Sequence, residues 1–274
     1  MSDDIGPVLV TGGTGTLGRR VVPKLLERGR EVRVLSRRAH AADRSAQSVP
    51  MSQTGVPVPQ WATGDLTTGK GLDAAVAGVS CIVHCATTGS GKDIDATRAL
   101  IEAARRAGGR PHLVYVSIVG VDLVPLFYYR AKLAAEKTIE DCGLPWSILR
   151  TTQFHDLLAR ITTVQRRSPV TLYPAGMSAQ PIEVDEVAQR LVELASGEPA
   201  GRVADMGGPE VHTMREFALL TLRAHGMRRP LLPVRLPGRA ARAYRAGHHT
   251  TPGHAVGVRT YSEYLAAVTS GRAR

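Results

Sequence analysis

Short apolar runs alternate with amphipathic segments along the first part of the chain. The first run extends from Gly6 to Thr11 and ends at glycines, which is typical of a buried parallel strand. From Thr16 to Arg28, leucines and valines recur at helical spacing, and Gly29 provides a C-terminal stop. Glu31 to Leu35 then predicts a second strand. This strand–turn–helix–strand unit indicates a right-handed crossover between parallel strands.

The same alternation continues to about residue 150. We expect strands at Cys81 to Cys85, His112 to Ser117 and Trp146 to Arg150, and helices at Leu72 to Ala77, Asp93 to Ala107 and Phe127 to Cys142. Such an order predicts an α/β protein with a Rossmann-type doubly wound parallel sheet and helices on both faces.

After Arg150 the alternation ends. We expect short strands at Val170 to Tyr173 and Arg202 to Met206, and helices at Asp185 to Ala195, Thr213 to His225, Arg239 to Arg245 and Thr260 to Val268. The helix that begins at Thr213 opens with the capping-box pattern. We therefore divide the chain into a sheet domain, residues 1–150, and a smaller mixed α/β region, residues 151–274. The second region would cover the sheet, and one of its strands can return to it.

Composition indicates an ordinary globular protein of 274 residues, 43% hydrophobic and 22% charged. No run approaches the roughly 18 apolar residues of a membrane span, so we expect no membrane partner. The acidic N-terminus, Met1-Ser2-Asp3-Asp4, lacks the positive charge of a signal peptide, which favours a cytoplasmic location. The three cysteines form no C-x-x-C pair, so we expect reduced, buried thiols and no metal site.

The net charge of +11 is unevenly distributed. The segment from Arg202 to Arg274 contains twelve arginines and four acidic residues, which accounts for +8 of the total. A basic region of this kind can bind an anionic partner, or it can be a solvated surface rich in arginine. From Arg228 to Arg245 the arginines are dispersed, and Tyr244 is the one aromatic residue among them, so we favour the solvated surface and do not expect nucleic-acid binding.

The turn between the first strand and the first helix contains a dinucleotide-binding pattern. Its residues are Thr11, Gly12, Gly13, Thr14, Gly15, Thr16, Leu17 and Gly18, which include both G-x-x-G-x-x-G and G-x-G-x-x-G. Glycine lets the backbone approach a pyrophosphate, and the free N–H groups at the helix start attract the anion. The turn therefore predicts a nucleotide site.

Ser36, Arg37 and Arg38 follow the second strand, where an NAD enzyme usually has an acidic residue for the ribose 2′-hydroxyl. A carboxylate would repel a 2′-phosphate, whereas guanidinium groups hold one through charge-assisted hydrogen bonds. We therefore expect NADP(H) as the cofactor. Alternatively, Arg37 and Arg38 are only surface charges.

Taken together, these motifs resemble the atypical branch of the short-chain dehydrogenase/reductase superfamily, which includes NmrA-like and isoflavone-reductase-like proteins. Further segments carry the resemblance: Gly64-Asp65-Leu66, Cys85-Ala86-Thr87-Thr88, Val116-Ser117, Tyr128-Tyr129-Arg130-Ala131-Lys132, Leu149 to Phe154, and Val184 to Ala188. The resemblance implies that Asp65 and Leu66 lie at the adenine, that Ala86 and Thr87 line the cofactor, and that Gln153 lies beside the nicotinamide.

The resemblance also implies a Ser-Tyr-Lys arrangement. Tyr128 and Lys132 are one helical turn apart, so the ammonium would favour the phenolate and would also hold the nicotinamide ribose. Ser117 would hydrogen-bond a substrate carbonyl. Phe127 and Tyr129 flank Tyr128, so a different ring can face the site, and His155 is a second acid/base candidate by residue type.

Two functions follow from this resemblance. One is an NADPH-dependent oxidoreductase that transfers hydride to a carbonyl, quinone or enone small molecule. The other is a non-catalytic, NmrA-like NADP(H)-binding redox sensor. The sequence makes no prediction of the oligomeric state.

Overall fold

The computed structural model describes residues 6–38, 58–87 and 91–270, so the acidic N-terminal residues lie outside the described part. The chain forms two compact units. The first contains residues up to 117, 130–149 and 187–203, and the second contains residues 118–129, 150–186 and those from 204 onward. The chain passes from the first unit to the second at residue 150, next to the boundary that the sequence predicted. Residues 118–129, predicted in the sheet domain, belong to the second unit, and residues 187–203, predicted in the smaller region, belong to the first.

A seven-stranded sheet forms the centre of the first unit. Its strand order is β3-β2-β1-β4-β5-β6-β9. The strands are β1 (Val8–Thr11), β2 (Val32–Ser36), β3 (Gln60–Thr63), β4 (Cys81–His84), β5 (His112–Ile118), β6 (Trp146–Thr151) and β9 (Gly201–Arg202). From β1, the chain adds β2 and β3 on one side and then β4, β5 and β6 on the other. This change of direction is typical of a doubly wound sheet, which confirms the predicted fold class.

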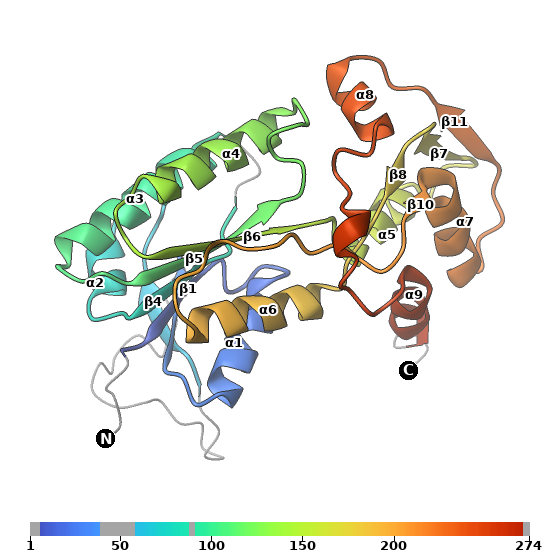
Figure 1. Cartoon of the computed structure of the whole chain (residues 1–274). Helices are drawn as coiled ribbons and strands as arrows, with labels where there is room; N and C mark the ends of the chain where they lie inside the picture. The colour runs from blue at the N-terminus through green and yellow to red at the C-terminus, as the bar shows by residue number, and fades with distance from the viewer. Residues whose placement is uncertain (1–5, 39–57, 88–90, 271–274) are drawn as a thin grey trace. The chain divides into compact units, whose positions relative to one another are not determined.

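Helices cover both faces of this sheet (Figure 1). They are α1 (Gly18–Glu27), α2 (Leu72–Val76), α3 (Lys92–Arg106), α4 (Phe127–Glu140) and α6 (Val184–Ser196). Figure 1 shows α3 and α4 on one face and α1 and α6 on the other. The first core cluster includes Leu9, Ile82, Leu113 and Ile148 from the strands and Leu100 from α3. Parallel strands buried on both faces need continuous apolar runs, which explains why the sequence predicted them well.

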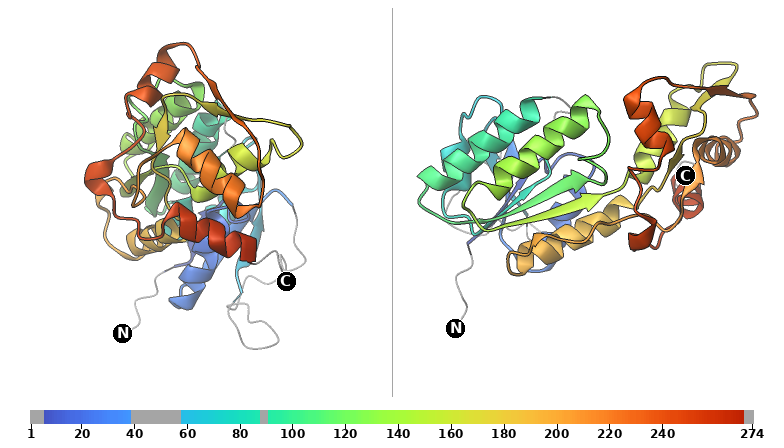
Figure 2. Two further views of the ribbon diagram at one scale, coloured as in Figure 1. Left: turned by 90° about the vertical axis from the view of Figure 1, so that its right-hand side faces the viewer. Right: turned by 45° about the horizontal axis from the view of Figure 1, so that its top comes forward.

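The second unit contains shorter elements. They are α5 (His155–Thr163), β7 (Thr171–Pro174), β8 (Ser178–Ala179), β10 (His212–Thr213), α7 (Met214–Ala224), β11 (Leu231–Val234), α8 (Arg239–Arg245), the 3₁₀-helix η1 (Pro252–His254) and α9 (Tyr261–Ser270). β7 pairs with β11 in parallel, and β8 pairs with β10 in antiparallel fashion. Helices α5, α7 and α9 pack together (Figure 2). Their core contains Leu158, Phe217, Tyr261 and Leu265.

Most predicted elements agree with the structure to within two residues at each end, and the capping box of α7 is present. One strand is shorter than predicted. Regular pairing at β9 ends at Arg202, and Met206 forms only an isolated bridge with Thr151. The sequence did not predict α5, β8, β10 or β11.

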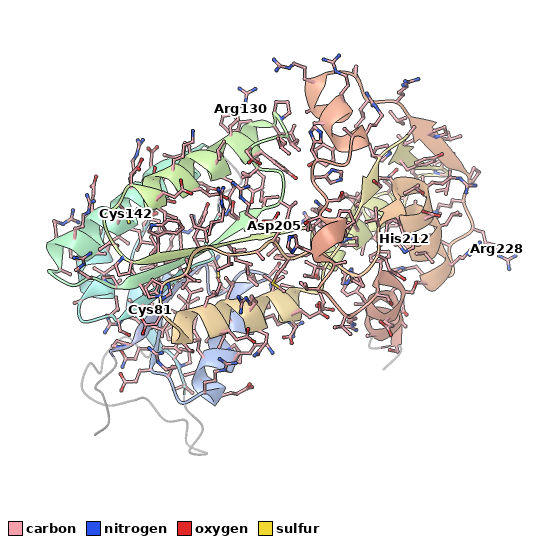
Figure 3. The ribbon with its side chains drawn as sticks, in the orientation of Figure 1. Cys81, Arg130, Cys142, Asp205, His212 and Arg228 are labelled. Atoms are coloured by element: carbon pink, nitrogen blue, oxygen red, sulfur yellow. The ribbon has the colours of Figure 1, made fainter. Side chains whose placement is uncertain are left out.

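All three cysteines are free thiols, with Cys81 and Cys142 buried (Figure 3). None of the helices in the described part of the chain is long and apolar enough to cross a membrane.

Candidate functional site

The glycine turn after β1 is shaped by close backbone contacts. Gly12 adopts a φ of 67°, and a Cβ atom there would lie 2.7 Å from the backbone nitrogen of Ala86. A Cβ atom on Gly18 would overlap the carbonyl oxygen of Gly12. At Gly15, by contrast, a Cβ atom would contact only the Gly12 oxygen, at 3.1 Å, and would otherwise enter open space. The fold therefore requires glycine at Gly12 and Gly18, and Gly15 keeps the front of the turn free for a ligand.

This turn leads directly into α1, which has no side-chain cap at its first residues. Thr14, Gly15 and Thr16 are exposed. Backbone carbonyl oxygens of Gly15 and Leu17 already accept the N–H groups of Arg19, Arg20 and Val21, so an anion at this helix start would meet the N–H groups that precede Arg19. The glycine cradle and the uncapped helix therefore fit a dinucleotide pyrophosphate.

A row of polar side chains crosses the sheet from this turn. Thr11, His84 and Tyr115 occupy paired positions in β1, β4 and β5. Thr11 Oγ1 lies 2.6 Å from His84 Nδ1, and His84 Nε2 lies 3.2 Å from Thr97 Oγ1. The Thr97 hydroxyl donates its proton to the Asp93 carbonyl oxygen, so Thr97 Oγ1 accepts from His84 Nε2, and His84 Nδ1 accepts from Thr11. The Ala86 N–H then donates to Thr11 Oγ1 at 3.3 Å, which ties the end of β4 to the turn.

His84 is neutral in this arrangement. Its side chain is 2% exposed, and burial together with the Lys132 charge lowers its pKa to about 3. A neutral ring matches the hydrogen-bond pattern, because one ring nitrogen donates and the other accepts. His84 thus stabilises the turn without carrying charge.

Lys132 lies at the end of this row. Its side chain is 4% exposed, and its ammonium donates to the Val116 carbonyl oxygen at 3.0 Å. The Nζ atom also lies 4.5 Å from the centroid of the Tyr115 ring, which stacks with His84. Burial lowers the pKa of Lys132 to about 8, although Asp93 and other acidic groups oppose the shift. Lys132 therefore carries a proton at neutral pH and titrates just above it.

Ser117 has a buried hydroxyl that lacks a hydrogen-bond partner within the described residues. Its side chain is 3% exposed and lies in β5, one residue after the carbonyl group that binds Lys132. A buried polar atom without a partner costs free energy unless a ligand completes it. This position fits the predicted contact with a substrate oxygen.

The end of β2 presents the predicted cationic pair. Arg37 and Arg38 are exposed, and the Arg38 N–H donates to Ser36 Oγ at 3.1 Å. Asp65 lies near Arg37 and accepts the Thr67 N–H at 2.8 Å; the Thr67 hydrogen bonds and, more weakly, the Arg37 charge lower the pKa of the Asp65 carboxyl group. Asp65 thus holds its own turn in place through its bond to Thr67. Leu66 packs against the core.

Two predicted site residues belong to the second unit. Tyr128 lies in the first turn of α4, four residues before Lys132, and its ring contacts Tyr129 edge to face. Tyr129 is 4% exposed, and its hydroxyl accepts a hydrogen bond from Tyr244 at 3.1 Å, so Tyr129 is a packed residue. The Gln153 amide donates to the His249 carbonyl oxygen at 3.1 Å. The predicted roles of Tyr128 and Gln153 at a nicotinamide stay predictions.

His155 is a core residue of the second unit. It is completely buried, its ring stacks on Tyr264 with centroids 5.2 Å apart, and its Nε2 atom lies 3.1 Å from the Arg259 carbonyl oxygen. Burial lowers its pKa. We therefore assign His155 to packing rather than to acid/base chemistry.

Sequence reasoning missed His84, Asp93 and Thr97. Asp93 accepts a hydrogen bond from the Thr87 hydroxyl at 2.5 Å and is 4% exposed. The available signal was a polar residue, His84, at the end of an otherwise apolar strand. Within the described residues, no group of three His, Cys, Asp or Glu side chains could hold a metal ion.

Comparison with known proteins identifies the type of site. The sequence matches the NAD(P)H-binding family over residues 12–198. The chain belongs to the NAD(P)H-binding family. The match covers the glycine turn, the end of β2 and Lys132, so the cofactor of this family member is a nicotinamide dinucleotide.

Two curated relatives are reductases. The chain is 30% identical over 228 residues to a (4-alkanoyl-5-oxo-2,5-dihydrofuran-3-yl)methyl phosphate reductase of Streptomyces griseus subsp. griseus, across 82% of this chain and 75% of the relative. It is also 30% identical over 225 residues to a chloroplastic divinyl chlorophyllide a 8-vinyl-reductase of Oryza sativa subsp. indica. That match covers 74% of this chain but only 54% of the rice protein.

Solved structures show the same fold at lower identity. An NADPH-dependent quinone oxidoreductase of Escherichia coli, complexed with NADPH, superposes with a TM-score of 0.79 at 16% identity and covers 95% of this chain and 99% of its own. A triphenylmethane reductase of Citrobacter sp. gives 0.75 at 19% identity and covers 96% and 99%. This shared fold and the family match confirm the resemblance to the atypical short-chain dehydrogenase/reductase branch, and the curated reductases support an oxidoreductase.

Proposed function

We propose that this protein is an NADPH-dependent reductase that transfers hydride to a carbonyl, quinone or enone small molecule. The observation that carries the proposal is the buried ammonium of Lys132, which lies in the same unit as the glycine turn and is connected to that turn by the polar row through His84 and Thr11. A buried cation with two N–H groups beyond its bond to Val116 is suited to hold hydroxyl groups of a ribose.

The residues present fit the cofactor. Within the turn from Gly12 to Gly18, the Gly15 N–H donates to the Gly12 carbonyl oxygen, and the other N–H groups would hold the pyrophosphate. Asp65 and Leu66 would border the adenine, and Ala86 and Thr87 would line the nicotinamide half. When bound, the reduced cofactor supplies the hydride.

The chain's own residues would orient the acceptor and supply the proton. The Ser117 hydroxyl, which has no partner within the described residues, would donate to the acceptor oxygen and polarise it. Lys132 Nζ keeps its proton at neutral pH, and its charge would lower the pKa of the Tyr128 phenol, one helical turn away on α4. Tyr128 or water would then donate the proton that completes reduction.

The preference for NADPH over NADH rests on the end of β2. Arg37 and Arg38 are two exposed cations at the end of β2, and they would hold the 2′-phosphate of NADPH. Charge-assisted hydrogen bonds to phosphate contribute about 1.5–3 kcal/mol each. Loss of one such bond corresponds to a roughly tenfold to hundredfold weaker complex.

The test combines binding and turnover. The double variant R37Q/R38Q should weaken NADPH binding at least about tenfold and leave NADH binding unchanged, as measured by nucleotide fluorescence. Turnover should be followed by NADPH absorbance with a 2-cycloalkenone, a 2,5-dihydrofuran-2-one and a benzoquinone. Binding without turnover of any acceptor would favour the redox sensor instead. Equal affinity for NADPH and NADH in the native protein would refute the cofactor preference.

A further inference from the structure

Two segments of the second unit contain no acidic residue. Residues 157–182 contain three arginines, and residues 217–262 contain eight, with no Asp or Glu in either segment. The segments are far apart in the sequence, but parallel pairing of β7 with β11 brings them together. The fold therefore concentrates the positive charge that the sequence only showed to be biased toward the C-terminus.

Exposed aliphatic side chains lie on this pair of strands. Leu172 and Leu232 are register partners, and they are 46% and 45% exposed. Val234 follows two residues after Leu232 on the same side of β11 and is 36% exposed. Helix α7 packs against β7 and β11, and Thr171, which precedes Leu172, is buried. These three aliphatic residues thus form the outer face of the two strands, which α7 does not cover.

Arginines border this aliphatic face. Arg229 donates to the Gln165 carbonyl oxygen at 2.8 Å and also to the Arg166 carbonyl oxygen, while the Gln165 amide donates to the Leu172 carbonyl oxygen at 3.1 Å. The Arg229 bonds join the segment before β11 to the turn that follows α5, and the Gln165 bond joins that turn to β7. Arg166, Arg228 and Arg235 are exposed, and Figure 3 shows Arg228 directed away from the ribbon. We name this surface, with Leu172, Leu232 and Val234 at its centre, the arginine–aliphatic face.

We propose that the arginine–aliphatic face docks the protein on an anionic lipid surface. Apolar side chains surrounded by arginines match the boundary between acyl chains and acidic headgroups, where the aliphatic groups leave water and the guanidinium groups remain at the phosphates. A second copy of this chain would present the same positive charge and be repelled. A nucleic acid offers no apolar phase for the three aliphatic side chains, and the face carries no aromatic residue for stacking on bases.

This inference changes one expectation from the sequence. The absence of a membrane span led us to expect no membrane partner, but peripheral docking needs no span. The proposal does not rest on the proposed reductase function, because the glycine turn and Lys132 belong to the first unit. Cofactor binding and lipid binding can therefore fail independently.

The test is co-sedimentation of the full chain with vesicles of phosphatidylcholine alone and of phosphatidylcholine mixed with phosphatidylglycerol. We expect binding only to the anionic vesicles, with loss of binding as NaCl is raised. An arginine near an anionic surface contributes about fivefold to partitioning, so R228Q/R235Q should bind about 25-fold more weakly. L172Q/L232Q should also weaken binding, because it replaces the two aliphatic side chains that would leave water at the lipid surface.

The matched control is R28Q/R202Q, which removes the same charge from exposed positions in the first unit. It should bind vesicles like the native protein, and all variants should keep the native circular dichroism spectrum and NADPH affinity. The proposal is overturned by absence of binding to anionic vesicles at low salt, by an equal loss in the control pair, by unchanged binding of L172Q/L232Q, or by tighter binding of a DNA duplex than of the vesicles.

Discussion

Replacement of Lys132 by Met tests the centre of the candidate site. Methionine has a similar length and is apolar, so the variant removes the charge and the three N–H groups while still filling the space beside Tyr115. It also leaves the carboxylates of Asp93 and Glu136 without this cation. We therefore expect a folded protein with weakened cofactor binding.

The magnitude follows from the hydrogen bonds of Lys132. Among the described residues, one acceptor, the Val116 carbonyl oxygen, takes one of its three N–H groups. A charged hydrogen bond to a ribose hydroxyl contributes about 1.5–3 kcal/mol. Loss of one such bond raises the dissociation constant of NADPH about tenfold to hundredfold, and loss of two raises it further.

The pH dependence gives an independent signature. With a pKa of about 8, Lys132 is roughly 90% protonated at pH 7 and roughly 10% protonated at pH 9. If the ammonium form binds the cofactor, the dissociation constant is constant below pH 8 and rises up to about tenfold per pH unit above it. In K132M this rise should disappear.

The assay is a fluorescence titration of NADPH between pH 6 and pH 9.5 with the native protein, K132M and K137M. Lys137 is an exposed lysine of the same helix, so its replacement controls for loss of one charge. The reasoning is refuted if K132M binds NADPH as tightly as the native protein, or if it retains the same pH profile.

Three further predictions concern stability, each measured by urea unfolding. G12A should destabilise the protein by at least about 1 kcal/mol more than G29A, because both positions have positive φ but only Gly12 would place a Cβ atom against Ala86; equal losses would contradict this. The depressed pKa of His84 means that unfolding takes up a proton below about pH 6.5, so the native protein should lose up to about 1.4 kcal/mol per pH unit as pH falls toward 3, and H84N should lose measurably less. T213A should cost about 1 kcal/mol through loss of the α7 capping box, whereas T213S should be close to native; similar losses in both variants would argue against the cap.

The sheet and the glycine turn were predictable because their signals are local. Continuous apolar runs mark β1, β4 and β5, which are buried on both faces, and the turn needs glycine within eight consecutive residues. Helix α5 was missed for a local reason too. Leu157 and Ile161 are 50% and 36% exposed on it, so its apolar residues do not mark a single buried face.

The polar chemistry was only partly predictable. Lys132 was found through the spacing of a known motif. Its hydrogen bond to Val116 and its cation–π contact with Tyr115, however, connect it to residues that are 16 and 17 positions earlier in the chain. The contact between Thr11 and His84 joins residues 73 positions apart. No pattern within a window of residues specifies such pairs, because β1 and β4 become neighbours only when the sheet assembles.

By itself, the sequence determined the alternation of strands and helices, the glycine turn and a nicotinamide dinucleotide as the class of cofactor, since each depends on residues within one or two elements. Tertiary structure decided which titratable groups are buried away from solvent and which charged segments lie close together. Burial lowers the pKa values of Lys132 and His84, and pairing of β7 with β11 brings together two distant segments that contain no acidic residue. Desolvation and proximity arise from packing, so they become defined only once the chain has folded.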